Sequence, residues 1–360
     1  MRARNLRRHA DGTGGSHTRS RGGRRAVAVS AVITTFGNGA QCERLVTSLR
    51  RGTVVPDEIV IVNNDPYHDL GQCEAFDGSS LQVVEAGRGA NLSAARNLGW
   101  SCTSGDLCLF VDDDNVVGPT MVEELVRAAS ERPAAAFAPL VVSYPTDTIW
   151  CAGVTRSKWL GRTRFIGSGS RLSSTRAVSD SPDFPNSFMI RANALAAVGG
   201  FDETAFPIHF CEADLFARMR EAGGGRLEVV PTAVVSHDSV ASASVSDELV
   251  RYATHGGAAR IRATARSRVL FFARHYTGLP RITCVVVGIP VWVIIAVASV
   301  LRASHPVRTR CWIVVNLLRG AGQGYRDMWG VVRRSPRWGR VQPKQALSGG
   351  RSEPEEESMR

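Results

Sequence analysis

Three consecutive carboxylates form the cluster best suited to chemistry. Asp112, Asp113 and Asp114 directly follow the apolar run Leu107–Val111. Side chains two residues apart in an extended turn point to the same side, so Asp112 and Asp114 are placed to share one ligand. A hard divalent cation such as Mg²⁺ or Mn²⁺ would relieve the repulsion among these oxygens. The alternative is an acidic surface turn that caps the next helix.

A second group of polar residues lies further along the chain. Glu212 begins a predicted helix over 212–222, where the helix dipole favours a charged carboxylate, so it is a candidate general base. Asp214 and Arg218 have the i, i+4 spacing of a helical ion pair. His237 follows a strand-like run, and an imidazole there would complete a Mn²⁺-type site. The alternative for the segment from Glu212 to Arg218 is a helix start with an ordinary ion pair, and the alternative for His237 is a structural histidine.

The segment Asn91–Gly99 opens another predicted helix and is rich in small residues. Helix N-termini present free N–H groups, so this one is placed to face a phosphate, as is the Arg96 side chain. Ordinary capping of the helix is the alternative.

Strand-like and helix-like patterns alternate from residue 27 to about 143, which predicts an α/β fold with a mostly parallel sheet. Polar clusters at 34–38, 63–65 and 112–114 each follow a predicted strand. Ligands of such sheets bind outside the carboxyl ends of the strands, so we expect the three clusters to share one rim. Residues 226–230 predict a further strand that ends before Pro231.

Taken in order, these blocks resemble the inverting family 2 glycosyltransferases, whose Rossmann-like fold is called GT-A. The resemblance covers residues 27–240 and leans toward the rhamnosyl- and galactofuranosyl-transferase-like branch. The similar blocks are Val32–Phe36, Glu58–Asn64, Asn91–Gly99, Phe110–Asp114 (the D-x-D motif), Ser187–Arg191, Val198–Glu203, Glu212–Arg218 and His237. Each motif is weak alone, but their shared order is a strong signal. The chain departs from the family pattern at Asn63 (usually Asp), Ser93 (often Gly) and Cys211-Glu212 (usually Glu-Asp).

The resemblance implies an enzyme that transfers a sugar from a nucleotide-diphospho-sugar to a glycan or lipid-linked acceptor, in cell-envelope or surface polysaccharide synthesis. It implies Glu212 as the catalytic base. The implied nucleotide-sugar-binding residues are Thr34, Thr35, Asn63, Asn64, Asn91, Arg96, Asp112 and Asp113. Asp112, Asp114 and His237 would hold Mg²⁺ or Mn²⁺. On the acceptor side it implies Trp150, His209, Phe210 and Asp214.

Composition sets the domain organisation. The 360 residues carry a net charge of +11 and are 44% hydrophobic, which excludes wholesale disorder and a collagen-like repeat. Residues 1–25 hold eight arginines against one aspartate and predict a disordered tail. We expect a GT-A domain over 26–245, a helical region over 246–340 and a second tail over 341–360. The eight cysteines form no C-x-x-C pair, which favours a reduced, cytosolic setting.

Residues 282–301 form an uncharged segment that is long enough to span a bilayer. Arginines flank it on both sides, so the positive-inside rule assigns no orientation. We favour a peripheral or re-entrant association with the cytoplasmic face of the plasma membrane. A single span ranks second and a buried core helix third.

Three other functions are alternatives. A nucleotidylyltransferase needs a basic residue in its first loop, and Thr34–Asn38 has none. A catalytically degenerate GT-A module that anchors a membrane complex is compatible with the departures at Asn63 and Cys211. Nucleic-acid binding by the arginine-rich tail would leave the acidic clusters unexplained, so no nucleic-acid partner is expected.

Overall fold

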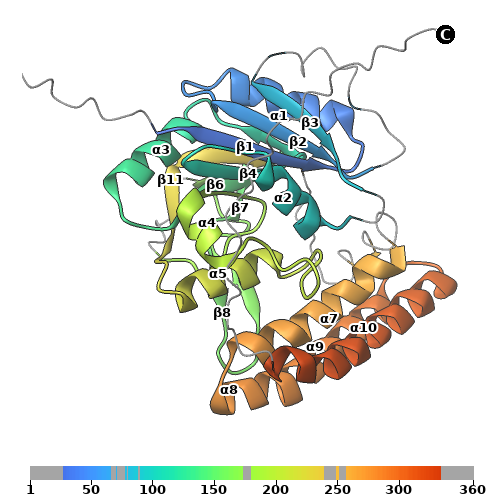
Figure 1. Ribbon diagram of the computed structural model, residues 1–360. Coiled ribbons are helices and arrows are strands. Elements are labelled where there is room, and N and C mark those ends of the chain that lie inside the picture. Colours follow the sequence, from blue (N-terminus) through green and yellow to red (C-terminus); the bar gives the residue numbers. More distant parts are fainter. Residues whose placement is uncertain are drawn as a thin grey trace, which may run out of the picture.

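The computed structural model describes residues 27–65, 70, 78, 80–87, 90–172, 180–238, 249–250 and 257–333. Both expected tails, 1–25 and 341–360, lie outside these residues. Figure 1 shows an α/β domain above a layer of long C-terminal helices.

The main sheet contains β1 (Val29–Thr35), β2 (Glu58–Asn63), β3 (Leu81–Glu85), β4 (Leu107–Asp112), β5 (Asn115–Val117), β6 (Ala136–Ser143), β7 (Thr148–Cys151), β10 (Ser187–Arg191) and β11 (Leu227–His237). Their order is β3-β2-β1-β4-β10-β6-β11-β5, with β7 on β6. The half of the sheet from β3 to β4 is parallel, and β10 runs antiparallel between β4 and β6. A separate hairpin pairs β8 (Val154–Arg156) with β9 (Thr163–Phe165). The predicted α/β fold with a Rossmann-like sheet is confirmed, and β10, β5 and β7 add antiparallel pairs to it.

The helices of this domain are α1 (Gly39–Arg50), α2 (Leu92–Ser101), α3 (Met121–Glu131), α4 (Ala192–Val198) and α5 (Cys211–Glu221). A close approach at Gly99 seats α2 on the sheet. A Cβ there would lie 2.4 Å from Val32 Cγ1 and 2.9 Å from Val62 Cγ2, so no larger residue fits. This contact fixes the position of every α2 side chain relative to β1 and β2.

The strand register places the expected polar clusters along one rim. Thr34 lies beside Asp112 on β4, and Thr35 lies beside Asn63 on β2. β1 is buried along its whole length, because it has a neighbouring strand on each side and helices cover the sheet. The carboxyl ends of three parallel strands therefore meet at the same edge, as the sequence predicted.

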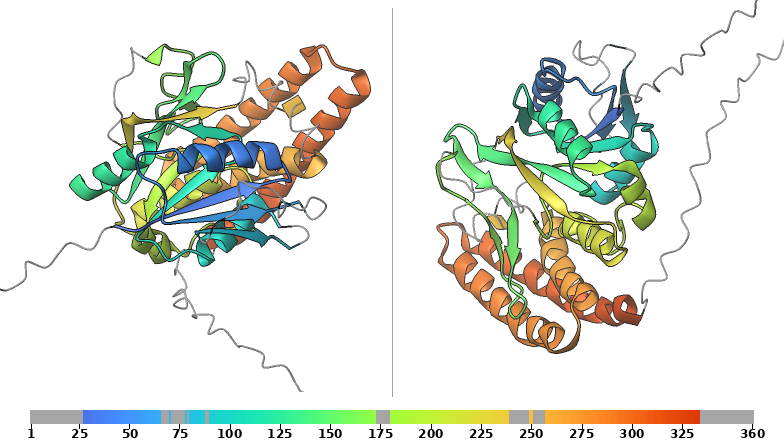
Figure 2. Two further views of the ribbon diagram at one scale, coloured as in Figure 1. Left: turned by 90° about the horizontal axis from the view of Figure 1, so that it is seen from above. Right: turned by 90° about the vertical axis from the view of Figure 1, so that its left-hand side faces the viewer.

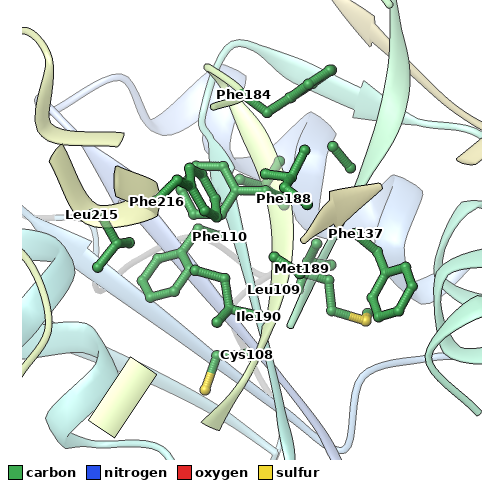
Figure 3. Close-up of a cluster of buried hydrophobic side chains, with 14 of the residues drawn as sticks. Cys108, Leu109, Phe110, Phe137, Phe184, Phe188, Met189, Ile190, Leu215 and Phe216 are labelled. Atoms are coloured by element: carbon green, nitrogen blue, oxygen red, sulfur yellow. The ribbon is translucent and has the colours of Figure 1, made fainter. Parts of the chain in front are cut away.

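Aromatic side chains fill the core directly beneath this edge (Figure 3). The ring of Phe188 lies 5.5 Å from that of Phe110 and 5.3 Å from that of Phe216, centroid to centroid. These residues come from β10, β4 and α5. The packing of the three rings therefore ties the helix that carries Glu212 to the strand that ends in Asp112.

One predicted boundary at a proline is wrong. Pro231 does not end the strand after residue 230, since β11 continues to His237. The pairing of β11 with β6 shifts between Val230 and Val234, which accommodates a residue without an N–H.

The C-terminal layer contains α7 (Gly257–His275), α8 (Gly278–Thr283), the π-helical turn η3 (Cys284–Gly288), α9 (Ile289–Arg302) and α10 (Val307–Arg333). Of the expected helical region over 246–340, residues 246–248, 251–256 and 334–340 lie outside the described part. Both views in Figure 2 show α7 and α10 running side by side, and they are in extensive contact. Buried residues of α7 such as Val269 and Phe272 belong to the core of the α/β domain, so this layer is not a detached module.

Candidate active site

Arg96 joins two of the predicted site residues. Its Nη2 donates to Asp112 Oδ1 at 2.8 Å, and its Nη1 donates to Glu212 Oε1 at 2.6 Å. The guanidinium comes from α2, Asp112 from the end of β4, and Glu212 from the first turn of α5. Phe188 and Phe201 place their rings near the guanidinium carbon, at centroid distances of 5.7 and 5.5 Å. The cation thus locks three elements together at the rim.

This arrangement corrects the expected role of Arg96. The residue is only 1% exposed, and its terminal nitrogens are directed at two carboxylates, so it does not reach out to a phosphate. Burial lowers the pKa of the guanidinium, but the charges of Glu212 and Asp112 outweigh burial and raise that pKa above its usual value. Arg96 is therefore a permanent buried cation that positions the two acids.

Both carboxylate oxygens of Glu212 are held in place. Oε1 accepts from Arg96, and Oε2 lies 3.1 Å from the Cys211 thiol, whose one proton is shared with the Ile208 carbonyl oxygen at 3.0 Å. The preceding residue, Phe210, has a left-handed φ of 63°, and this bend turns the chain into α5. The Glu212 side chain stays 16% exposed, so it is oriented and still accessible from one side. These are the properties required of a general base.

Asp113 carries a carboxyl group that is poorly stabilised as an anion. Thr35 Oγ1 donates to its Oδ2 at 2.6 Å, which favours ionisation. Burial and the neighbouring charges of Asp114 and Asp112 oppose this and raise the pKa of Asp113 to about 7. Three adjacent acids with one bound arginine therefore leave negative charge that a ligand cation would offset.

Asp114 and His237 lie together, as expected. His237 Nε2 is 3.0 Å from Asp114 Oδ2, and the Trp150 ring packs edge-on against the imidazole with the ring centroids 4.9 Å apart. Asp112 faces Arg96 instead of this pair. Among the residues that the structure describes, no three His, Cys, Asp or Glu side chains are arranged to hold one ion, so the predicted set of three ligands is not assembled here.

Two of the expected nucleotide contacts are engaged in structural hydrogen bonds. Asn63 is fully buried, its amide nitrogen lies 3.1 and 3.2 Å from the Glu85 carboxylate oxygens, and its amide oxygen accepts from the Asp65 N–H. Asn91 is the N-cap of α2, where its side-chain oxygen accepts from the Ala94 N–H at 3.0 Å. Both amides are therefore occupied by hydrogen bonds within the protein, and nucleotide binding by Asn63 and Asn91 stays a prediction.

Asn64 differs from its neighbour. It is 8% exposed, and neither its amide oxygen nor its amide nitrogen has a hydrogen-bond partner in the described part of the chain. A buried amide without partners costs free energy that a ligand can recover. Its backbone N–H donates to the Thr35 carbonyl oxygen, which fixes the residue at the rim.

Comparison with known proteins identifies the α/β domain. Residues 30–199 match the family model described as glycosyl transferase family 2. The chain contains a family 2 glycosyltransferase domain. It is also 30% identical over 235 residues to the pre-mycofactocin glycosyltransferase of Mycobacterium tuberculosis (strain ATCC 25618 / H37Rv), which is 64% of this chain and 46% of that protein. Over 100 residues it is 31% identical to the uncharacterized glycosyltransferase YwdF of Bacillus subtilis (strain 168), covering 28% of this chain and 37% of that protein.

The chain therefore spans less than half the length of these curated relatives. Among solved structures it is similar to the mannosyltransferase PcManGT from Pyrobaculum calidifontis in complex with GDP-Man and Mn²⁺. That match has a TM-score of 0.49 and 14% sequence identity, and it covers 84% of this chain and 88% of the other.

The expected acceptor side of the glycosyltransferase domain separates into two groups. Trp150 stacks between His237 and Phe165, with both ring centroids 4.9 Å away, so it borders the acidic rim. Phe210 and His209 lie two and three residues before Glu212 in the chain. Burial and the nearby arginines Arg260 and Arg268 lower the pKa of His209 to about 3, which keeps its ring neutral.

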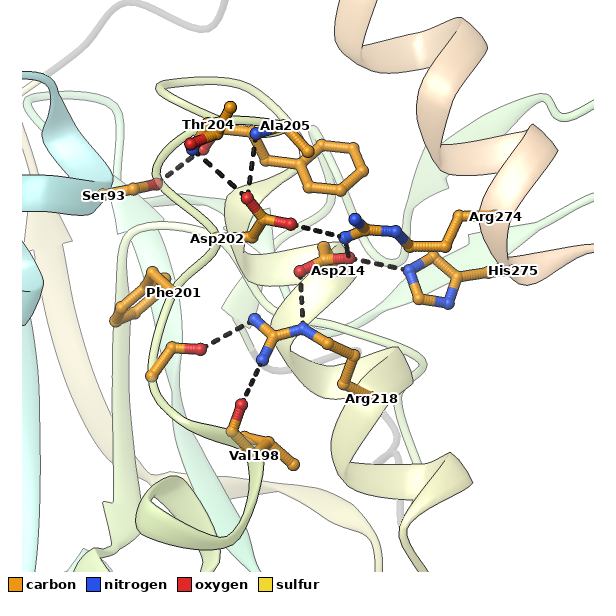
Figure 4. A network of polar contacts seen from close by, with 12 residues as sticks. Ser93, Val198, Phe201, Asp202, Thr204, Ala205, Asp214, Arg218, Arg274 and His275 are labelled. Atoms are coloured by element: carbon orange, nitrogen blue, oxygen red, sulfur yellow. Dashed lines mark hydrogen bonds and ion pairs between the residues drawn. The ribbon is translucent and has the colours of Figure 1, made fainter. Parts of the chain in front are cut away.

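Asp214 is not on the acceptor side of the glycosyltransferase domain, which corrects the prediction. Its side chain is completely buried; Oδ2 accepts from Arg218 Nε at 2.7 Å, and Oδ1 pairs with both Arg274 and His275 at 2.8 Å (Figure 4). Arg274 also donates to Asp202 Oδ2 at 2.8 Å. The carboxylate thus joins α5 to α7 and has no oxygen left for an acceptor.

This network makes the stability of the glycosyltransferase domain depend on pH. Burial opposes ionisation of Asp214, but the hydrogen bond from His275 and the charges of Arg218 and Arg274 lower its pKa to about 2, from 3.8. Burial likewise opposes the charged form of His275, yet Asp214 and Glu221 raise its pKa above 6.5. The stabilisation by His275 is complete below pH 6.5 and is lost as the pH rises through the raised pKa of His275. The stabilisation by Asp214 is complete above pH 3.8 and is lost as the pH falls toward 2.

We therefore expect His275→Gln to remove part of the pH dependence of unfolding. The free energy of unfolding of the wild type, measured in urea, should fall relative to that of the variant when the pH is raised above 6.5. If the difference between the two proteins is the same at pH 5.5 and 8.5, His275 is not held as a cation.

Sequence reasoning missed the residues that support the site from α7 and from the loop before α5. Arg274 is 60 residues from Asp214 and 72 residues from Asp202, and His275 is 61 residues from Asp214, so no local pattern links these pairs. Cys211 was noted only as a departure from a family motif, although its thiol donates to Glu212. The two adjacent basic residues within the expected helical region over 246–340 were the one available signal for Arg274 and His275.

Proposed function

We propose that this protein transfers a sugar from a nucleotide-diphospho-sugar to an acceptor hydroxyl, with inversion at the anomeric carbon. The observation that carries the proposal is the ion-paired unit of Asp112, Arg96 and Glu212. In this unit the Glu212 carboxylate is oriented, partly exposed and close to the rim formed by the carboxyl ends of the parallel strands. Hexosyl or rhamnosyl transfer fits this site equally.

Glu212 is the proposed base. Its carboxylate takes the proton of the acceptor hydroxyl as that oxygen forms a bond to the anomeric carbon. The bond from the same carbon to the diphosphate oxygen breaks on the opposite face, and the nucleoside diphosphate leaves. One such displacement inverts the configuration. Arg96 and Cys211 keep the Glu212 oxygens in the orientation that this proton transfer needs.

Asp114 and His237 are the proposed protein ligands of a divalent metal, with Asp112 close by on the same turn. Mg²⁺ is usually held by one or two carboxylates together with substrate phosphates, so a pair of side chains fits a metal that binds with the diphosphate. The raised pKa of Asp113, caused by burial and by its two acidic neighbours, also favours a cation here. When bound, such a metal neutralises charge on the departing diphosphate.

Thr34 and Asn64 are the proposed contacts for the nucleotide. Thr34 lies beside Asp112 on the rim, and the Asn64 amide has no hydrogen-bond partner in the described residues. An amide can donate to and accept from a nucleobase edge or a ribose hydroxyl. Thr35 contributes indirectly, because its hydroxyl holds Asp113.

Release of nucleoside diphosphate from UDP-, GDP- and dTDP-sugars tests the function, with total membranes supplied as the source of acceptor. We expect one donor class to be consumed, and EDTA to stop the reaction until Mg²⁺ or Mn²⁺ is restored. Retention of the donor's anomeric configuration in the product would contradict the single displacement. Failure of every donor, with and without metal, would favour the degenerate binding module.

A glycan or lipid-linked acceptor at the cytoplasmic face of the plasma membrane is the proposed second substrate, in envelope or surface polysaccharide synthesis. One helical segment, Gly278–Arg302, is long and apolar enough to cross a membrane, which supports a location near lipid. An acceptor carried on lipid would meet a site that is attached to the same surface.

A further inference from the structure

The C-terminal helices expose an unusual amount of apolar surface. Thirteen of the 22 exposed large hydrophobic side chains in the described part of the chain lie between residues 279 and 329. We call the outward side of α8 to α9 the apolar face; it is formed by Ile282, Val286, Val291, Ile294, Ile295 and Leu301. Val286 is 64% exposed and Ile294 is 66% exposed, so the centre of this face contacts no other part of the described protein closely. Contiguous apolar surface of this kind marks a site of association.

The opposite side of the same helices is packed against the protein. Ile289, Ala296 and Val300 are buried, whereas Val291 and Ile294 point outward at helical spacing. The segment therefore has one side committed to the protein core and one side free for a partner.

Three close contacts to backbone atoms hold residues 284–288, near the start of the segment, against the protein. A Cβ at Gly288 would lie 2.6 Å from the Leu160 carbonyl oxygen, so the two backbones touch. Tyr325 of α10 donates to the Val285 carbonyl oxygen at 2.6 Å, and the Cys284 thiol donates to the Lys158 carbonyl oxygen at 3.3 Å. Moving the helix into a spanning position would break these contacts and expose its buried side.

The charge around the apolar face indicates the chemistry of its partner. Residues 257–333 contain twelve arginines and one carboxylate, Asp327. Arg302, Arg308, Arg319 and Arg326 are exposed on α9, on α10 or close to their ends. Arginines beside exposed isoleucine and valine fit the headgroup and acyl boundary of an anionic bilayer. A nucleic acid would match the arginines but not the apolar side chains between them.

We propose that the apolar face binds an anionic bilayer in the plane of the membrane, with both basic flanks of the segment on the same leaflet. α7 lies in this layer and holds α5 through Asp214, so the bound membrane surface is rigidly connected to the helix that carries Glu212. The proposal concerns binding and stands whether or not the site transfers a sugar.

Sedimentation of the full-length protein with preformed vesicles tests this. We expect binding to vesicles with about one third phosphatidylglycerol and at least about tenfold weaker binding to pure phosphatidylcholine, because each arginine at an anionic surface adds to the affinity. The double variant I294E/I295E should weaken binding by about tenfold or more, since two exposed aliphatic side chains that the bilayer would bury are replaced by carboxylates. Val55→Glu, which alters an exposed valine (46%) far from this face, is the matched control and should bind like the wild type.

Equal binding of I294E/I295E and the wild type, or binding that ignores lipid charge, would overturn the proposal. The proposal would also be overturned if the wild type bound no vesicles but formed a dimer in buffer that the double variant did not form. Complete displacement of the protein from vesicles by duplex DNA would overturn it too. Trypsin added to sealed inverted membrane vesicles distinguishes the topology: cleavage on both sides of residues 282–301 supports the in-plane arrangement, and cleavage on one side alone shows a span. The double variant should melt at the same temperature as the wild type, which would show that a loss of binding is not caused by unfolding.

Discussion

Glu212→Gln is expected to reduce sugar transfer by about 10²–10⁴-fold while leaving nucleotide binding near the wild-type value. The amide keeps the shape of the carboxylate and can still accept from Arg96, so the ends of β4 and α5 stay together. It has no basic oxygen to take the acceptor proton. The measurement is turnover under saturating donor, alongside nucleotide affinity by calorimetry.

The matched control is Glu221→Gln, the same substitution at the far end of the same helix. Its side chain is 41% exposed and pairs with His275 instead of the site. We expect Glu221→Gln to retain most of its turnover. Wild-type turnover in Glu212→Gln would show that another group removes the proton.

Arg96→Met is expected to destabilise the fold by about 3–5 kcal/mol, the typical cost of removing one partner from a buried ion pair. Methionine fills part of the space between Phe188 and Phe201, but Asp112 and Glu212 lose the cation that both of them contact. The free energy of unfolding in urea measures the effect. Nucleotide affinity should also fall, because the end of β4 is no longer fixed to α5.

Arg44→Met is the control for Arg96→Met. Arg44 pairs with Asp238 at 2.9 Å, but the two side chains are 51% and 39% exposed, so this ion pair contributes at most about 1 kcal/mol. Adding Glu212→Gln to Arg96→Met should recover part of the stability, since one unpaired charge is removed. An Arg96→Met protein as stable as Arg44→Met would contradict the role of Arg96 as a buried counter-ion.

Local patterns were sufficient for the parallel half of the fold. The apolar runs of β1, β2 and β4 are each followed by polar residues, and parallel pairing must bring those ends to one edge. The family resemblance, together with the chemistry of a Mn²⁺-type site, grouped Asp114 with His237 although they are 123 residues apart. Local patterns failed at Pro231, where an irregular register lets a strand continue.

Sequence patterns do not predict the direction in which a side chain points. Asn63 and Asn64 are adjacent and chemically identical, yet only Asn63 has its amide turned inward to Glu85. The family resemblance assigned Arg96 and Asp214 to ligand contacts. Some of their partners are 60 or more residues away along the chain, as in the contacts of Arg96 with Glu212 and of Asp214 with Arg274. Only the packed structure reveals that each charge is buried and paired with an opposite charge.

The melting temperature of the protein with UDP, GDP, dTDP and CMP, each with and without Mn²⁺, tests the site most directly. A ligand that binds only the folded state raises the melting temperature, by about 5 °C or more at a hundredfold excess over its dissociation constant. We expect such a rise for one nucleotide class, only with Mn²⁺, and no rise in Asp114→Ala. No rise with any nucleotide, or a rise that Asp114→Ala retains without metal, would contradict a metal-dependent nucleotide-sugar site at this rim.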